Sequence, residues 1–152
     1  MIDVIWGSAK EKPNSSRSLA EDLTAIPNGG GYLYLGYPII GTPTGPMKLD
    51  ALLVSPTFGL VAFDLVEGTD LGEFGARQDE IASMLDVRLK PYAGLKAGRS
   101  LKFDINVVTY APAKAHLPDA DPPYFVANRA DIGAKVEGFH WNATTGVFQN
   151  LV

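Results

Sequence analysis

The stretch that decides the fold runs from Lys48 to Glu67 and reads KLDALLVSPTFGLVAFDLVE. Two apolar runs, 49–55 and 60–67, flank a short connection at Pro56–Gly59, and this pattern predicts a hairpin of two antiparallel strands. Both strands carry apolar residues at successive positions, so we expect both faces of their sheet to be covered. The hairpin is therefore the expected centre of a layered domain.

Outward from the hairpin, the sequence predicts two helices and two further strands. Residues 15–26 and 76–90 place apolar side chains at helical spacing, while the runs 32–37 and 101–110 favour strands. The expected order is helix, strand, strand, strand, helix, strand, and the second helix crosses over to the last strand. We therefore expect an α/β fold, an α+β mixed sheet with helices on the sheet faces.

The 152 residues suit one domain. Its core is expected at about 15–110, and 111–152 forms a C-terminal extension without clear periodicity. Within the extension we expect a proline-rich loop, a short strand at 124–127 and a helical turn at 131–136. Because the chain ends on apolar residues, we also expect it to be part of a longer protein.

Composition excludes several classes of protein. The 13 basic and 17 acidic side chains give a formal net charge of −4, which excludes a generally basic nucleic-acid-binding surface but not a local basic strip. Cysteine is absent, so disulfides, cysteine-zinc sites and thiol nucleophiles are excluded. No apolar run approaches the roughly 20 residues of a membrane helix. With no signal-peptide pattern either, we expect a cytoplasmic protein that does not contact membranes.

Common catalytic motifs are missing from the sequence. There is no G-x-x-x-x-G-K-[ST] phosphate loop and no G-x-S-x-G nucleophile turn. His116 and His140 each stand alone, outside any H-E-x-x-H pattern. Carboxylates are therefore the remaining source of chemistry.

Two carboxylates of the hairpin form the candidate site. Asp50 opens the first strand and Asp64 lies in the second, both toward the ends away from the turn, so cross-strand pairing can bring them together on one face. Two adjacent acids among apolar residues repel each other, and a divalent cation such as Mg²⁺ or Mn²⁺ relieves that repulsion. We then expect the carboxylates within metal-bridging reach. The alternative is that each acid caps a backbone group or pairs with Arg77 or Lys48.

Gln78 is a third candidate. It lies three residues before Ile81 and seven before Leu85, on the apolar stripe of the second helix. An amide that faces the sheet needs a polar partner. That partner is either the carboxylate site across the sheet or the nearby loop.

These features together resemble the PD-(D/E)XK nuclease superfamily. Within it, residues 48–64 resemble the nuclease-related domain (NERD) found at the N-terminus of superfamily I DNA helicases, and the resemblance covers roughly 15–110. It implies a restriction-endonuclease-like αβββαβ core. It also implies that Asp50 and Asp64 are metal ligands and catalytic acids, and that Gln78 is the polar residue of the following helix.

Two departures from the family pattern imply an impaired site. Val66 occupies the lysine position of the E-x-K motif and cannot orient or activate a water molecule. The acid of the first helix falls near Ser15 or Ser16 and is missing. Lys48 and Lys102 are the nearest candidates in sequence for a relocated lysine.

The resemblance thus implies a vestigial nuclease site that binds Mg²⁺ or Mn²⁺ weakly or not at all. The expected partners are DNA, bound weakly, or a DNA-processing protein or the chain's own downstream helicase domains. Two alternatives stay open: an active Mg²⁺-dependent nuclease with a relocated lysine, and a non-enzymatic protein-interaction domain.

Overall fold

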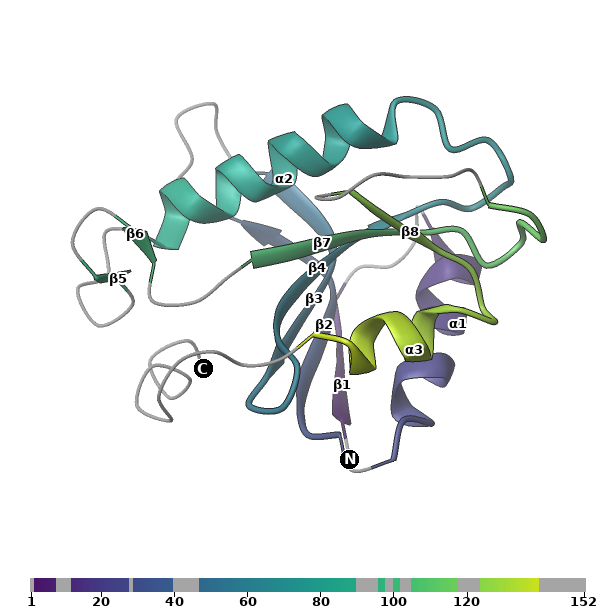
Figure 1. Ribbon diagram of the computed structural model, residues 1–152, viewed down its shortest axis with the longest axis horizontal. Coiled ribbons are helices and arrows are strands. Elements are labelled where there is room, and N and C mark those ends of the chain that lie inside the picture. Colours follow the sequence, from purple (N-terminus) through teal and green to yellow (C-terminus); the bar gives the residue numbers. More distant parts are fainter. Residues whose placement is uncertain are drawn as a thin grey trace.

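The computed structural model describes residues 2–7, 12–27, 29–39, 47–89, 96–97, 100–101, 105–117 and 124–139 (Figure 1). Within these residues lie three helices and eight strands. In order they are β1 (Ile2–Trp6), α1 (Pro13–Thr24), β2 (Gly31–Ile39), β3 (Met47–Ser55), β4 (Gly59–Leu65), α2 (Phe74–Leu89), β5 (Lys96–Ala97), β6 (Ser100–Leu101), β7 (Ile105–Tyr110), β8 (Phe125–Ala127) and α3 (Ile132–Glu137).

Six strands form one mixed sheet in the order β1-β2-β3-β4-β7-β8, so the expected α/β class is confirmed. The three central strands β2, β3 and β4 run antiparallel, whereas β1, β7 and β8 each pair in parallel with their neighbour. The predicted hairpin is also confirmed, because β3 pairs with β4 from Ala51 opposite Phe63 to Ser55 opposite Gly59. The Ser55 hydroxyl accepts the N–H groups of Thr57 and Phe58 and so holds the turn.

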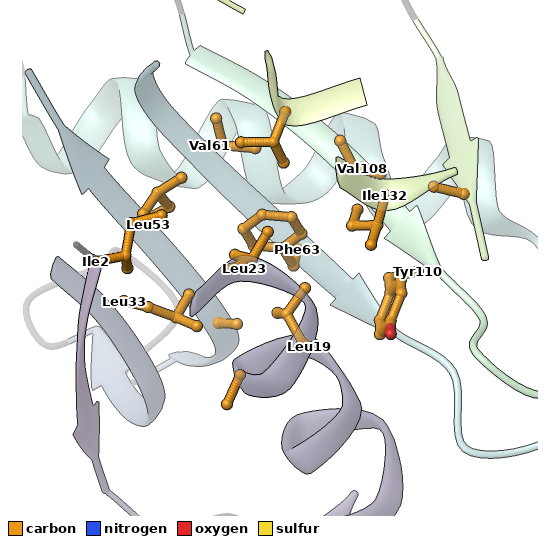
Figure 2. Close-up of a cluster of buried hydrophobic side chains, with 14 of the residues drawn as sticks. Ile2, Leu19, Leu23, Leu33, Leu53, Val61, Phe63, Val108, Tyr110 and Ile132 are labelled. Atoms are coloured by element: carbon orange, nitrogen blue, oxygen red, sulfur yellow. The ribbon is translucent and has the colours of Figure 1, made fainter. Parts of the chain in front are cut away.

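The helices lie on opposite faces of the sheet, with α1 and α3 on one side and α2 on the other (Figure 1). Figure 2 shows the larger core, where Leu19 and Leu23 of α1 and Ile132 of α3 meet the strands around Phe63. A smaller cluster packs Ile81 and other residues of α2 against β4 and β7. All seven residues of β4 are buried, as expected for a strand covered on both faces.

Two elements differ from the sequence prediction. The predicted strand 101–110 is shorter: β7 begins at Ile105, and Ser100–Leu101 pairs separately with Lys96–Ala97, while 102–104 lie outside the described residues. Strand β1 was not predicted, because its five residues find their partner only after α1 has crossed back. Among the described residues, no helix has the length and apolar character needed to span a membrane.

Candidate functional site

Asp50 and Asp64 lie at the open end of the β3–β4 hairpin. The last paired positions there are Ala51 and Phe63, so the two acids are the next residue on each strand. The Leu65 N–H donates a 3.0 Å hydrogen bond to the Asp50 Oδ2. The Asp50 carboxylate therefore contacts the backbone directly after Asp64.

Asp50 is paired with a cation that sequence reasoning missed. Lys12, just before α1, places its Nζ 2.7 Å from the Asp50 Oδ2 and 2.7 Å from the Leu65 carbonyl oxygen. The sequence analysis offered Lys48 as a partner, but the Lys48 side chain is not among those that the structure describes. The expectation that Asp50 caps a backbone group is confirmed by its bond to Leu65.

Asp64 is buried and accepts three hydrogen bonds from two donors, one on α2 and one on β7. The Arg77 Nε lies 3.0 Å from both carboxylate oxygens, and the Thr109 hydroxyl donates a 2.9 Å bond to Oδ2. Arg77 is fixed in turn by a 2.6 Å bond from its Nη2 to the Leu71 carbonyl oxygen. Burial raises the pKa of Asp64, while Arg77 and Thr109 oppose the rise. The expected alternative, a pairing of Asp64 with Arg77, is confirmed.

Gln78 reaches Asp64 through Thr109. Its Nε2 donates 2.8 Å bonds to the Thr109 hydroxyl and to the Phe125 carbonyl oxygen. Its side chain is buried on the sheet side of α2, as the apolar stripe predicts. The Thr109 hydroxyl thus accepts from Gln78 and donates to Asp64, because the parallel register sets Thr109 beside Asp64.

The site therefore consists of two neighbouring networks. One joins Asp64, Arg77, Thr109 and Gln78; the other joins Asp50 and Lys12. The positive charge of Lys12 also acts on Asp64 and, like Arg77 and Thr109, opposes the rise of its pKa. That the two carboxylates bridge one metal ion stays a prediction.

In this arrangement the residues present do not fit a divalent cation. Such a cation needs several free oxygen ligands, yet oxygens of both carboxylates already accept bonds from protein donors. In the described part of the chain, no three His, Asp or Glu side chains are grouped to hold a metal. Binding would require Arg77 or Lys12 to move away.

Val66, which the family resemblance implies at a lysine position, is part of the core. It is buried in a cluster with Leu71, Ala111 and Val126. Its N–H donates to the Tyr110 carbonyl oxygen at 2.9 Å, which continues the pairing of β4 with β7. The side chain offers no hydrogen-bonding group and no charge at this point of the site.

Glu67, which follows β4, contacts the first turn of α1 at Ser15, where the family resemblance implies an acid of the helix itself. The Glu67 Oε1 accepts 2.7 Å bonds from the Ser15 N–H and the Ser15 hydroxyl, and Oε2 accepts a 3.3 Å bond from Asn14. Burial acts to raise the pKa of Glu67, but the bonds from Ser15 and Asn14 outweigh it, so this pKa is lowered. Glu67 therefore caps the first turn of α1 from its position just after the C-terminal end of β4.

Replacing Glu67 by glutamine is expected to lower the free energy of unfolding by about 1 kcal/mol at pH 7, because a charged cap is lost. Since the folded-state pKa is lowered, this contribution is present above the ordinary glutamate value of 4.5 and is lost as the pH falls below it. Urea unfolding followed by circular dichroism at neutral and acidic pH measures the difference. The exposed Glu80→Gln is the control and should change little at either pH. A Glu67→Gln deficit that is the same at both pH values would contradict this account.

No family model, curated protein or solved structure matches this chain. The functional assignment of the site therefore rests on the geometry of its own residues.

Proposed function

We propose that this chain is a catalytically impaired nuclease-like domain that serves a DNA-processing protein, such as a helicase, as a DNA-binding or interaction module. The order of elements supports this proposal. An antiparallel β2–β3–β4 unit follows α1, and α2 leads to β7, which pairs in parallel with β4. That order accords with the αβββαβ core that the PD-(D/E)XK resemblance implies.

The observation that carries the proposal is the pairing of Asp64 with Arg77. In metal-dependent nucleases, carboxylates of this kind hold a divalent cation that stabilises the charge developing on the phosphoryl group. Here the Arg77 guanidinium lies across both oxygens of Asp64 and supplies the positive charge itself. Because an arginine stays charged and cannot activate water, the carboxylate keeps a structural partner instead of a catalytic one.

The buried Val66 supports the same conclusion. A nucleophilic water needs a base or a cationic group beside the carboxylates, and valine provides neither. The net charge of −4 favours weak contact with DNA over tight duplex recognition. We further propose a cytoplasmic location and no membrane contact.

A second candidate is an active nuclease with a relocated lysine. The observation that favours it is Lys12, whose Nζ lies 2.7 Å from Asp50. A lysine there lies beside the candidate carboxylates without belonging to the E-x-K motif. The third reading, an interaction domain with purely structural acids, agrees with the hydrogen bonds of Asp50 and Asp64 but assigns no role to DNA.

We expect no nicking of supercoiled plasmid above the EDTA control after hours with Mg²⁺ or Mn²⁺. The reason is that Arg77 and Lys12 pair with the carboxylates and Val66 lacks a reactive group. Gel electrophoresis of the wild-type chain, Asp50→Ala and Asp64→Ala measures the result. Nicking by the wild type that disappears in both variants would overturn the proposal, and Lys12→Ala, Lys48→Ala and Lys102→Ala would then locate the lysine.

Two further measurements separate the remaining readings. Salt-dependent binding of a DNA oligonucleotide favours a DNA-contacting module, whereas no binding at low salt favours a protein-interaction domain. Activity created by Val66→Lys would support descent from a nuclease. Val66→Met is its matched control, because methionine has similar length but no ammonium group.

A further inference from the structure

A shallow cleft of about 430 Å³, widely open to solvent, lies where β4 and β7 end. One wall comes from the loop between β4 and α2, and the other from the loop that follows β7; both loops leave the same end of the sheet in Figure 1. Its volume falls within the roughly 300–1,000 Å³ typical of small-molecule sites. Ligands of open α/β sheets bind outside the carboxyl ends of parallel strands, which is the place of this cleft.

Two basic side chains line the cleft, and neither pairs with an acid among the residues that the structure describes. Lys114 and His116 lie two residues apart in the loop after β7, and no described carboxylate forms an ion pair with either. Asp70 also lines the cleft, but its Oδ1 accepts the Gly72 N–H at 3.0 Å within its own loop. This bond holds the Asp70 carboxylate within its own wall but leaves it charged, and Lys114 on the opposite wall supplies the positive charge for an anion.

The backbone that carries these basic groups is fixed by hydrogen bonds. The Asn128 amide donates to the carbonyl oxygens of Lys114 at 3.1 Å and Ala115 at 3.4 Å. The Lys114 N–H donates to the Ala111 carbonyl oxygen at 3.2 Å. A loop held in this way loses little conformational entropy when a ligand binds.

The remaining lining is apolar and includes an aromatic ring. Leu71, Phe74 and Leu117 line the cleft, and they pack on the buried cluster around Val66. Phe74 and Leu117 are only partly buried, so part of their surface faces the cleft. An anion with a flat, weakly polar body matches both halves of this surface.

We propose that the cleft binds a nucleotide, with its phosphate on Lys114 and His116 and its base against Phe74 and Leu117. Aromatic side chains beside basic groups are how proteins hold single-stranded nucleic acid. A free nucleotide and a nucleotide unit of single-stranded DNA share this chemistry. That the bound nucleotide belongs to single-stranded DNA rests on the proposed function. The cleft itself does not involve Asp50 or Asp64.

The test is a titration of the ¹⁵N-labelled full chain with dTMP, an oligo-dT single strand and inorganic phosphate, followed by amide chemical shifts. We expect the nucleotide and the oligonucleotide to shift the amides of Gly72 and of 114–117. Lys114→Gln should weaken binding about five- to tenfold, as the loss of a charged hydrogen bond does elsewhere. Lys135→Gln removes the same charge from α3, which does not line the cleft, and should leave the affinity within about twofold.

The outcomes distinguish the cleft from the proposed function. Shifts with the oligonucleotide that are lost in the Lys114→Gln/His116→Gln variant support both. Shifts with dTMP alone support the cleft and contradict DNA as its source. Oligonucleotide binding that survives in the double variant overturns the cleft and leaves the DNA-binding module standing. Equal shifts with inorganic phosphate, or equal weakening by Lys135→Gln, also overturn the nucleotide site.

Discussion

Replacing Arg77 by methionine is expected to lower the free energy of unfolding by about 2–3 kcal/mol at pH 7. The Asp64 side chain is 3% exposed and would keep Thr109 as its remaining described donor. Methionine preserves the aliphatic reach of Arg77 but supplies no charge. The value lies below the range of about 3–5 kcal/mol for fully buried pairs, because the Arg77 side chain is itself 38% exposed.

The pH dependence of this loss identifies its cause. Burial already raises the pKa of Asp64, and removing Arg77 raises it further. A carboxyl group with a raised folded-state pKa stabilises the fold while it is protonated and loses that contribution as the pH rises through this pKa. The deficit of Arg77→Met should therefore be largest at pH 7, shrink as the pH falls through the raised pKa of Asp64, and be small at the ordinary aspartate value of 3.8.

Urea unfolding at the two pH values measures this deficit. The matched control is the double variant Arg77→Met/Asp64→Asn, in which no carboxylate remains to be left unpaired. It should recover most of the stability at pH 7. A deficit that is independent of pH, or a double variant no more stable than Arg77→Met, would show that the ion pair does not hold Asp64.

Replacing Gly31 by alanine is expected to lower the free energy of unfolding by about 3–4 kcal/mol. Gly31 begins β2 with φ at +114°, a backbone conformation that residues with a side chain rarely adopt. An added Cβ would overlap the Val54 carbonyl oxygen and lie 2.7 Å from the Ser55 Cα. Because both contacts are backbone, relieving them would push β2 away from β3.

Gly30 provides the control for this substitution. A Cβ at Gly30 would meet nothing within 4 Å, so Gly30→Ala should leave the melting temperature nearly unchanged. Thermal unfolding followed by circular dichroism compares the two variants, and Gly31→Ala should melt roughly 6–16 °C lower. Equal melting temperatures would contradict the assigned backbone conformation.

The central hairpin and both long helices were predicted because their signals are local. The apolar runs, the turn at Pro56–Gly59 and the helical spacing lie within windows of a dozen residues. Strand β1 escaped prediction because a five-residue apolar run gains strand character only from a distant parallel partner. The boundaries of β7 were misjudged for a related reason, since continuous apolar sequence does not show where pairing begins.

The acids of the candidate site and the pairing of Asp64 with Arg77 were predicted from the sequence, whereas the partners Thr109 and Lys12 were not. The strand period placed Asp64 on one face with Asp50, and the helix period placed Gln78 on the apolar stripe of the second helix. Thr109 comes from a strand 45 residues away, and Lys12 comes from the segment before α1, so no spacing in the sequence joins either to the hairpin. The contact of Glu67 with Ser15 was likewise not predicted, because the two residues lie 52 positions apart in the sequence.

The two outermost strands of the sheet are short. β1 has five residues and includes the exposed Asp3 and the 52% exposed Trp6, and β8 has three, whereas β2 and β3 have nine each. An open edge is a row of unpaired backbone groups that can recruit a strand from another chain, and short edges or edges with charges limit this recruitment. This sheet therefore offers little template for amyloid-like stacking or strand addition. Partners that extend a sheet are disfavoured, and contacts through the loops are favoured instead.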